Sequence, residues 1–362
     1  MCLYNGTKFL IVNKSSLSVT KMMISRIGIF RALYLGDMLC IIPAVRSVRS
    51  AFPHAQIFLI GLPWQRDFVK RFSHYFDEFI EFPGWPGLPE QQPDVENILR
   101  FLQHIRTYHF DIIFQMQGNG EITNSMCMLW GAKKVCGLRK GQGYAPDHDL
   151  FPVSEDNEHE VQRFLKLPAA LNLSLPGEEL EFPLFPEERQ RAMQILHESG
   201  LHTGEYVCVH PGARDPRRRW AAEKFAVIAD KIVTSGYPIV LTGSAEERDV
   251  IKAVQEKIRG PVVNIVELYG HLGVGELAAL VSMAKLLVSN DTGVSHLAAA
   301  MEVPSVIIFS QYSEINRWRP LNDTLHIAIP WERTSDIGFV ERCVVNMLGG
   351  DKTAGVYQHR HI

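Results

Sequence analysis

The segment ISRIGIFRALYLGDMLCIIPAVRSVRSAFP, residues 24–53, decides the fold of this chain. Residues 24–30 are apolar and rich in β-branched isoleucine, which predicts a buried strand. A short loop leads into residues 37–52, which have the apolar spacing of a helix, and Pro53 ends that helix. A strand that leads into a helix in this way is the repeating unit of a parallel sheet covered by helices.

The same alternation continues through the first half of the chain and predicts a Rossmann-like domain over residues 23–178. Further strands are expected at 55–61, 76–82, 110–118 and 133–138, with helices at 64–72 and 95–110 and a Pro/Gly-rich loop at 83–93. Residues 1–22 lack this pattern and are expected to form a flexible tail. Met22 and Met23 directly precede the first strand, so either could be the true start of the protein.

The second half repeats the pattern and predicts a second Rossmann-like domain over residues 188–334. Its strands are expected at 206–210, 238–243, 261–265, 286–289 and 305–310, with helices at about 222–235, 246–258 and 275–284 and another from 294. Residues 179–187 belong to a proline-containing run with little periodicity, which is typical of an interdomain linker. Two such domains leave a cleft at the carboxyl ends of their strands, where open α/β sheets bind ligands.

The composition is that of a globular protein. The 362 residues are 46% apolar and 21% charged, and the net charge of −3 gives no global field that would hold a nucleic acid. The six cysteines have no C-x-x-C spacing, so neither a zinc site nor a disulfide framework is indicated, and a reducing cytoplasm fits best. No run of about 18 apolar residues predicts a membrane span.

Gly36 and Asp37 form the first candidate site, in the loop after the first strand. Asp37 could simply accept the backbone N–H groups of the helix that it opens. It could equally face the cleft and take a proton from an acceptor hydroxyl that attacks a sugar carbon. The sequence leaves both roles open.

The loop HPGARDPRRRW, residues 210–220, joins the first strand and first helix of the second half. A leaving diphosphate develops negative charge, which fixed cations can stabilise. Arg217, Arg218 and Arg219 could supply that charge, although adjacent arginines cannot all face one site. The alternative is an ordinary solvated basic loop.

The segment VSNDTGVSHLAAAMEVP, residues 288–304, is the most informative motif. A strand ends before Asp291, and a helix begins just after Gly293. Such a helix start offers backbone N–H groups and a positive dipole end to an anion, and Thr292 adds a hydroxyl. The alternative is an ordinary helix cap, with His296 as a surface histidine.

Three further motifs each have a functional and an ordinary structural interpretation. In LTGSAEERD, residues 241–249, Glu246 could bind ribose hydroxyls or merely favour a helix start. GVGELA at 273–278 follows a loop rather than a strand, which argues against a dinucleotide fingerprint. Asp147, His148 and Asp149 spell D-x-D in a Gly/Pro-rich loop, and no other ligand spacing occurs, so no metal site is expected.

Taken together, these segments resemble glycosyltransferase family 9, the ADP-heptose:lipopolysaccharide heptosyltransferases. The resemblance implies a GT-B fold of two Rossmann-like domains facing a cleft, with residues 335–350 as a terminal helix that returns to the first domain and residues 351–362 as a tail. It also implies inverting, metal-independent transfer of heptose from ADP-heptose to a lipopolysaccharide-core hydroxyl, with no cofactor. The residues that this implies are Asp37 as base, Arg218 as the basic residue before the tryptophan, Glu246 near the ribose, and Asp291, Thr292, Gly293 and His296 at the donor diphosphate.

One turn departs from the family pattern. After the strand SVIIF the family usually has Gly-Pro-Thr, whereas residues 310–313 here are Ser-Gln-Tyr-Ser. The donor sugar, its base and the acceptor therefore stay open. A sugar-nucleotide epimerase of the same architecture and a non-catalytic nucleotide-sugar binding protein are the alternatives to a transferase.

A glycolipid acceptor would place the enzyme at the cytoplasmic face of the inner membrane. Trp64, Arg66, Arg71 and Trp85 of the first domain are the residues that we would expect to touch it. Scattered surface residues of these types are common in proteins without membrane contacts, so liposome sedimentation would be needed to support this hypothesis.

Overall fold

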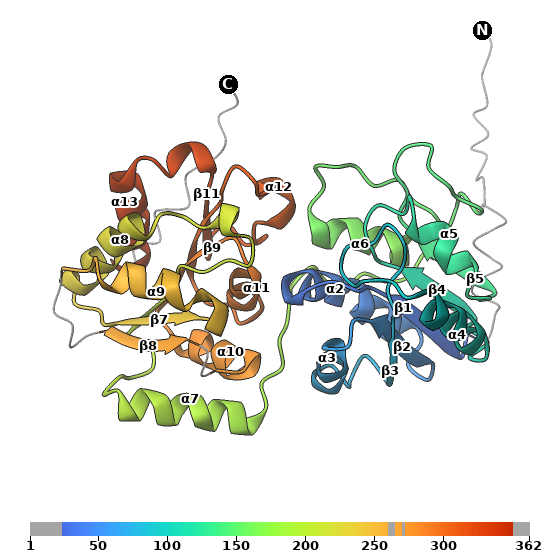
Figure 1. The fold of residues 1–362 in the computed structure, drawn as a ribbon, viewed down its shortest axis with the longest axis horizontal. Helices are drawn as coiled ribbons and strands as arrows, with labels where there is room; N and C mark the ends of the chain where they lie inside the picture. The colour runs from blue at the N-terminus through green and yellow to red at the C-terminus, as the bar shows by residue number, and fades with distance from the viewer. Residues whose placement is uncertain (1–23, 260–264, 270–271, 350–362) are drawn as a thin grey trace, which may run out of the picture.

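The structure is a computed structural model that describes residues 24–259, 265–269 and 272–349. Two α/β domains lie side by side (Figure 1), which confirms the predicted fold class. The first domain holds a parallel sheet in the order β3-β2-β1-β4-β5. Its strands are β1 (Arg26–Phe30), β2 (Gln56–Gly61), β3 (Glu78–Glu81), β4 (Ile112–Gln115) and β5 (Lys134–Gly137).

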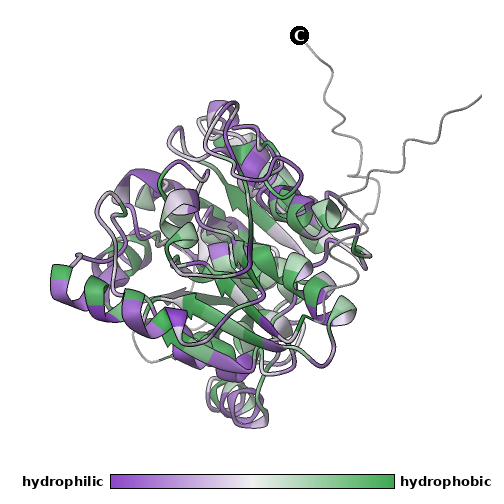
Figure 2. Ribbon diagram, turned by 90° about the vertical axis from the view of Figure 1, so that its right-hand side faces the viewer, coloured by the Kyte–Doolittle hydropathy of each residue, from purple (hydrophilic) through white to green (hydrophobic). Residues whose placement is uncertain are grey.

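Helices cover this sheet because its central strands are apolar on both faces. Ile27, Ile29 and Phe30 of β1 are fully buried, as expected for a central parallel strand. The helices are α2 (Leu35–Ala51), α3 (Gln65–Arg71), α4 (Val95–Arg106), α5 (Thr123–Met128) and α6 (Glu160–Ala170). Helix α2 packs along α6. Figure 2 shows hydrophobic residues gathered on the strands and on the inner sides of the helices.

The second domain holds a parallel sheet in the order β11-β10-β9-β6-β7-β8. Its strands are β6 (Val207–His210), β7 (Ile239–Gly243), β8 (Ile265–Tyr269), β9 (Leu286–Asn290), β10 (Ser305–Ile308) and β11 (His326–Ile329). The strand expected at 261–265 falls mostly on residues outside the described ranges. Strand β11 was not expected from the sequence, and it pairs with β10 at the edge of the sheet.

The helical elements of the second domain follow the expected alternation. They are α7 (Pro186–Glu198), η1 (Pro216–Arg218), α8 (Ala222–Thr234), η2 (Ala245–Glu247), α9 (Arg248–Gln255), α10 (Val274–Met283), α11 (Gly293–Ala300), α12 (Ile315–Trp318), η4 (Trp331–Arg333) and α13 (Ile337–Gly349). Gly273 caps α10, as expected for a helix start rather than a dinucleotide loop. Within the described part of the chain, no helix combines the length and apolarity that a bilayer crossing needs.

Helix α13 corrects one expectation. It was expected to return to the first domain, but Val340, Val344 and Leu348 are buried in the core of the second domain. There α13 packs against α8, β9 and β10, on the side of the domain far from the first sheet (Figure 1). The family resemblance implied a helix over these residues, and a helix is present, but it packs against the second domain instead of the first.

Candidate active site

Asp37 lies in the first turn of α2, on the side where the two domains meet. The helix begins at Leu35 rather than at Asp37, and the residue before its first turn is Tyr34, whose side chain makes no capping bond. Asp37 is therefore not the capping residue itself. Its carboxylate is 23% exposed and lies 3.3 Å from a guanidinium nitrogen of Arg31.

The protonation of Asp37 is set by opposing effects. Burial raises the pKa of its carboxyl group, and the Arg31 guanidinium lowers it; the balance is a pKa above the ordinary aspartate value. Glu160 raises this pKa further, and Arg317 lowers it. A carboxylate with a raised pKa accepts a proton more readily at neutral pH than an exposed aspartate does.

Asp291 and Arg218 form the corresponding pair in the second domain. Asp291 follows β9 and is 1% exposed, and its Oδ2 accepts a hydrogen bond from Nη2 of Arg218. Arg218 also donates from Nε to the hydroxyl of Ser313 at 3.0 Å. Oδ1 of Asp291 is buried and makes no hydrogen bond to any described residue. The arginine is therefore held in a fixed orientation at the end of β9.

The start of α11 faces the start of α2. Thr292 precedes α11 in an extended conformation, and its hydroxyl makes no capping bond. A Cβ placed on Gly293 would lie 3.9 Å from the backbone nitrogen of Gly36. The positive dipole ends of two helices from different domains therefore converge. Asp37 lies in the first turn of α2, and Arg218 bonds to Asp291, two residues before the start of α11.

His296 is not a surface histidine but a buried residue between the domains. It is 7% exposed, and its Nδ1 lies 3.8 Å from Sγ of Cys40 on α2. Its ring meets the ring of Trp318 edge-on at 6.0 Å. Burial lowers the pKa of His296 to about 4, although Asp291 opposes the shift, so the imidazole is neutral at pH 7.

Gly36 is required because α2 passes so close to His296. A Cβ on Gly36 would lie 2.6 Å from Cδ2 of His296, too close without a shift of one helix. We expect Gly36→Ala to lower the thermal midpoint and to reduce the domain contact, as seen by faster hydrogen exchange in α2 and α11. Gly338→Ala, where no atom lies closer than 3.4 Å to an added Cβ, is the matched control. Wild-type exchange in Gly36→Ala would refute this packing argument.

The structure separates the three adjacent arginines. Arg217 pairs with Asp215 and lies over the ring of Tyr312, while Arg219 donates to the carbonyl of Ala213. Among the three, only Arg218 contacts Asp291. The turn at residues 310–313 therefore contacts two of these arginines. Tyr312 lies against Arg217, and Ser313 accepts a hydrogen bond from Arg218.

Glu246 is exposed in η2, at the carboxyl end of β7. Its neighbour Glu247 is the buried carboxylate, 7% exposed, and it accepts from the backbone of Ser244 at 2.8 Å and lies 3.7 Å from His210. The exposed position leaves Glu246 available to a ligand at the edge of the second sheet.

Several residues near Asp37 were missed from the sequence. Arg214 is exposed, and its guanidinium carbon lies 3.6 Å from the centre of the Tyr34 ring, across the domain boundary. Glu90, from the Pro/Gly-rich loop, has a pKa that burial raises, with a further contribution from Asp37. Arg31 and Glu160 are fully buried ions. The one feature of the sequence that could have indicated these residues is the charge of Arg31 directly after a buried strand.

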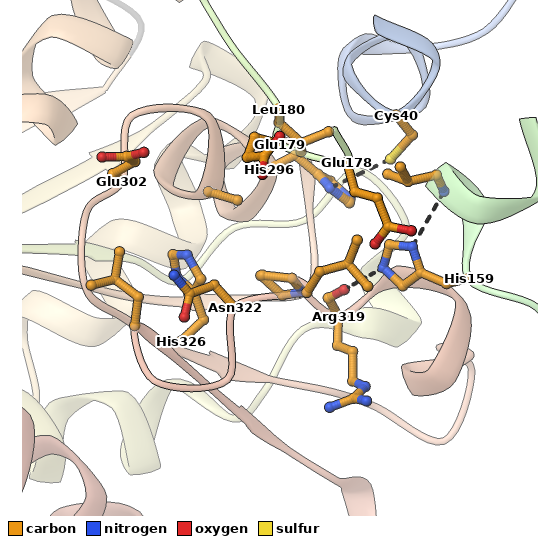
Figure 3. A pocket seen from close by; sticks show the side chains of 15 residues that line it. Cys40, His159, Glu178, Glu179, Leu180, His296, Glu302, Arg319, Asn322 and His326 are labelled. Carbon is orange, nitrogen blue, oxygen red and sulfur yellow. Dashed lines mark hydrogen bonds between the residues drawn. The ribbon is translucent and has the colours of Figure 1, made fainter. Parts of the chain in front are cut away.

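A cavity of about 280 Å³ lies between the domains, behind the contact of α2 with α11. Figure 3 shows Cys40 and His159 of the first domain opposite His296, Arg319 and His326 of the second. Nε2 of His159 donates to the carbonyl oxygen of Arg319 at 2.6 Å. Asp37 and Asp291 do not line this cavity, although His296, which packs against Gly36, does.

Two other expectations concern metals and membranes. Asp147 pairs with Lys134 at 3.5 Å and accepts from the backbone of Asp149, and the described residues contain no group of three ligands suited to a metal ion. Trp64 and Arg66 are exposed. Arg71 instead pairs with Glu188, and Trp85 packs against the core of the first domain.

Comparison with known proteins identifies the family that this chain matches. A model described as glycosyltransferase family 9 (heptosyltransferase) matches residues 98–347. Lipopolysaccharide heptosyltransferase 3 of Escherichia coli is 23% identical over 304 residues, which are 80% of this chain and 84% of that protein. Lipooligosaccharide heptosyltransferase 2 of Haemophilus influenzae is 29% identical over 223 residues, 58% of this chain and 61% of that protein.

A solved structure shows the same fold. The E. coli ADP-heptose lps heptosyltransferase II superposes with a TM-score of 0.70 at 19% identity, covering 91% of this chain and 100% of that one. This likeness shows the GT-B arrangement expected from the sequence. The chain belongs to glycosyltransferase family 9, and it is a glycosyltransferase.

Proposed function

We propose that this enzyme transfers a sugar, heptose from ADP-heptose, to a hydroxyl group of a lipopolysaccharide-core acceptor, with inversion and without a metal ion. The observation that supports this best is the approach of Gly36, the neighbour of Asp37 in the first domain, to Gly293 at the start of α11 in the second. A proton acceptor and an anion-binding helix start thus come together. The names of the relatives, all heptosyltransferases, support the choice of sugar and acceptor.

In this proposal the two domains divide the chemistry. Asp37 removes the proton from the acceptor hydroxyl as its oxygen attacks the anomeric carbon. The diphosphate leaves from the opposite face of the sugar, so a single displacement inverts that carbon. The negative charge that develops on the diphosphate is stabilised by the start of α11 and by Arg218, which Asp291 orients. Fixed protein charges thereby take the place of a metal ion.

The direct test is acceptor-dependent release of nucleoside diphosphate. We expect ADP release from ADP-heptose in the presence of a heptose-accepting lipopolysaccharide-core saccharide, and only slow release without it. Proton NMR of the donor alone would show an epimerised sugar if the protein were an isomerase. Binding of donor without turnover in either mixture would identify a non-catalytic binding protein and refute the proposal.

The donor is tested separately because the 310–313 turn departs from the family. Ser313 accepts from Arg218, so this turn influences the arginine that would meet the diphosphate. Thermal shift with ADP-, GDP- and UDP-sugars ranks the donors, since a ligand that binds only the folded state raises its stability. A larger shift with a GDP- or UDP-sugar than with ADP-heptose would replace the proposed donor.

A further inference from the structure

A buried carboxylate, Glu160, holds three arginines together beside Asp37. Glu160 is the first residue of α6 and is 2% exposed. Its oxygens accept from Nη2 of Arg31 at 2.9 Å, from Nη1 of Arg163 at 2.7 Å, and from Nε of Arg317 at 2.7 Å. Burial alone would raise the pKa of Glu160, but the three guanidinium groups lower it to about 2, so it is ionised at neutral pH.

Arg31 is shared between Glu160 and Asp37. The same nitrogen, Nη2, lies 2.9 Å from Glu160 and 3.3 Å from Asp37. Arg31 is completely buried, with its guanidinium carbon 4.5 Å from the centre of the Phe164 ring and Nη1 bonded to the carbonyl of Met116. Because Arg31 has no exposed surface, its distance from Asp37 is set by these neighbours. Glu160 therefore controls the ion that lies against the proposed base.

Arg317 is the one of the three that comes from the second domain. It lies on α12, whereas Arg31, Arg163 and Glu160 belong to the first domain. Its Nη1 also contacts Glu314 of its own helix, at 3.2 Å. Separation of the domains would leave Glu160 with two arginines and would remove one positive charge from the surroundings of Asp37. Interfaces between domains of one chain commonly allow such motion.

We propose that Glu160 and Arg317 are positioning residues, through which contact of the second domain fixes Arg31 beside Asp37 and so prepares the base. The inference rests on the proposed role of Asp37, but the arrangement of charges that it describes can be tested without activity. Neither residue needs to touch the substrate for this. The meeting of the domains would then bring the start of α11 and Arg218 to the base and complete the electrostatic setting of that base.

The sign of the effect follows from the charges around Asp37. Arg317 lowers the pKa of Asp37, and Glu160 raises it. Loss of Arg317 should therefore raise this pKa, and loss of Glu160 should lower it. The other charged or titratable groups that surround Asp37 are Arg31, Glu90, His296 and Cys40, with Arg214 over Tyr34. These groups are unchanged in the variants below, so they provide a constant background.

The first experiment is a carboxyl titration of the full chain by NMR with ¹³C-labelled aspartate, the Asp37 signal being assigned from its loss in Asp37→Asn. We expect the Asp37 pKa to rise in Arg317→Gln, to fall in Glu160→Gln, and to return toward the wild-type value in Arg317→Lys. Arg319→Gln is the matched control, since Arg319 pairs with Asp323 inside the second domain. An Asp37 titration in Arg317→Gln equal to that of wild type would overturn the proposal.

The second experiment measures the domain contact. Spin labels at Glu96→Cys and Glu256→Cys, in a background with Cys2 replaced by serine, report the distance between the domains by double electron–electron resonance. The cysteines in the described residues are buried. We expect a longer and broader distance distribution in Arg317→Gln than in wild type or Arg319→Gln. An unchanged distribution would likewise contradict the proposal, even if Glu160→Gln failed to fold.

Failure of the inference can be told from failure of the proposed function. Acceptor-dependent ADP release by the wild type with no change of titration or distance in Arg317→Gln would refute only the positioning role. Absence of transfer by the wild type, with both shifts present, would refute only the proposed function. Where transfer is present, we expect activity to fall at a higher pH on the acidic side in Arg317→Gln than in wild type, and at a lower pH in Glu160→Gln.

Discussion

Replacing Asp37 by asparagine should lower kcat for sugar transfer by about 10²- to 10⁴-fold, the usual contribution of a general base. The amide preserves the shape of the side chain but cannot take a proton. Nucleotide binding should stay close to the wild-type level because the donor seat belongs to the second domain. Steady-state kinetics of ADP release, together with a calorimetric Kd for ADP, measure both quantities.

The same role for Asp37 predicts how transfer activity depends on pH. Asp37 must be ionised to act, and burial raises its pKa, so wild-type activity should be lost as the pH falls through a value above that of an ordinary aspartate. The asparagine variant should lack that acidic limb. Wild-type rates in Asp37→Asn, or a residual rate with the same acidic limb, would remove Asp37 as the base.

Stability distinguishes a chemical effect from an unfolded protein. A carboxyl whose pKa is raised by folding contributes stability at low pH that is lost as the pH rises through the folded-state pKa. Ionised Asp37 therefore destabilises the fold at neutral pH, and Asp37→Asn should melt at the wild-type temperature or above it. A large drop in the melting temperature would mean that the loss of rate came from misfolding.

Replacing Arg218 by alanine should lower kcat/KM for the donor by about 10²- to 10³-fold, the usual effect of removing one group that stabilises developing charge. The substitution also leaves Asp291 buried without its cation, which should cost up to about 3 kcal/mol of stability. Donor-dependent kinetics and a thermal melt measure the two effects. Arg218→Lys should recover part of the activity, since it keeps the charge but not the planar fork.

The neighbouring arginine provides the control for this prediction. Arg217 pairs with Asp215 inside its own loop, and its side chain is 68% exposed. Arg217→Ala should therefore change donor kcat/KM far less than Arg218→Ala. Equal losses in the two variants would show that the loop contributes only general positive charge, and that the Arg218–Asp291 contact has no special part in catalysis.

Much of the fold could be predicted from the sequence because the signals are local. The alternation of apolar strands and amphipathic helices in segments such as residues 24–53 predicts parallel sheets, and a strand's carboxyl end marks where a loop can carry chemistry. This alternation predicted Asp37 near the start of the helix that follows β1, and Asp291 directly after β9. Helix α13 was expected from the family resemblance, which placed it against the first domain, whereas it packs in the second.

The network around the base could not be predicted, since its members are far apart in the chain. Arg31 and Glu160 are 129 residues apart, and Glu160 and Arg317 are 157 apart. No local period connects such residues, and each alone resembles an ordinary surface charge. The same holds for His296, whose burial depends on the approach of α2 from the other domain.

The sequence by itself therefore determined the two α/β domains, the strand ends that carry Asp37 and Asp291, and the family resemblance. The tertiary structure decided which arginine meets Asp291, which ions surround Asp37, and where α13 packs. The physical reason is that secondary structure follows from the spacing of neighbouring residues, whereas the pKa of a buried group depends on charges that only folding brings within a few ångströms.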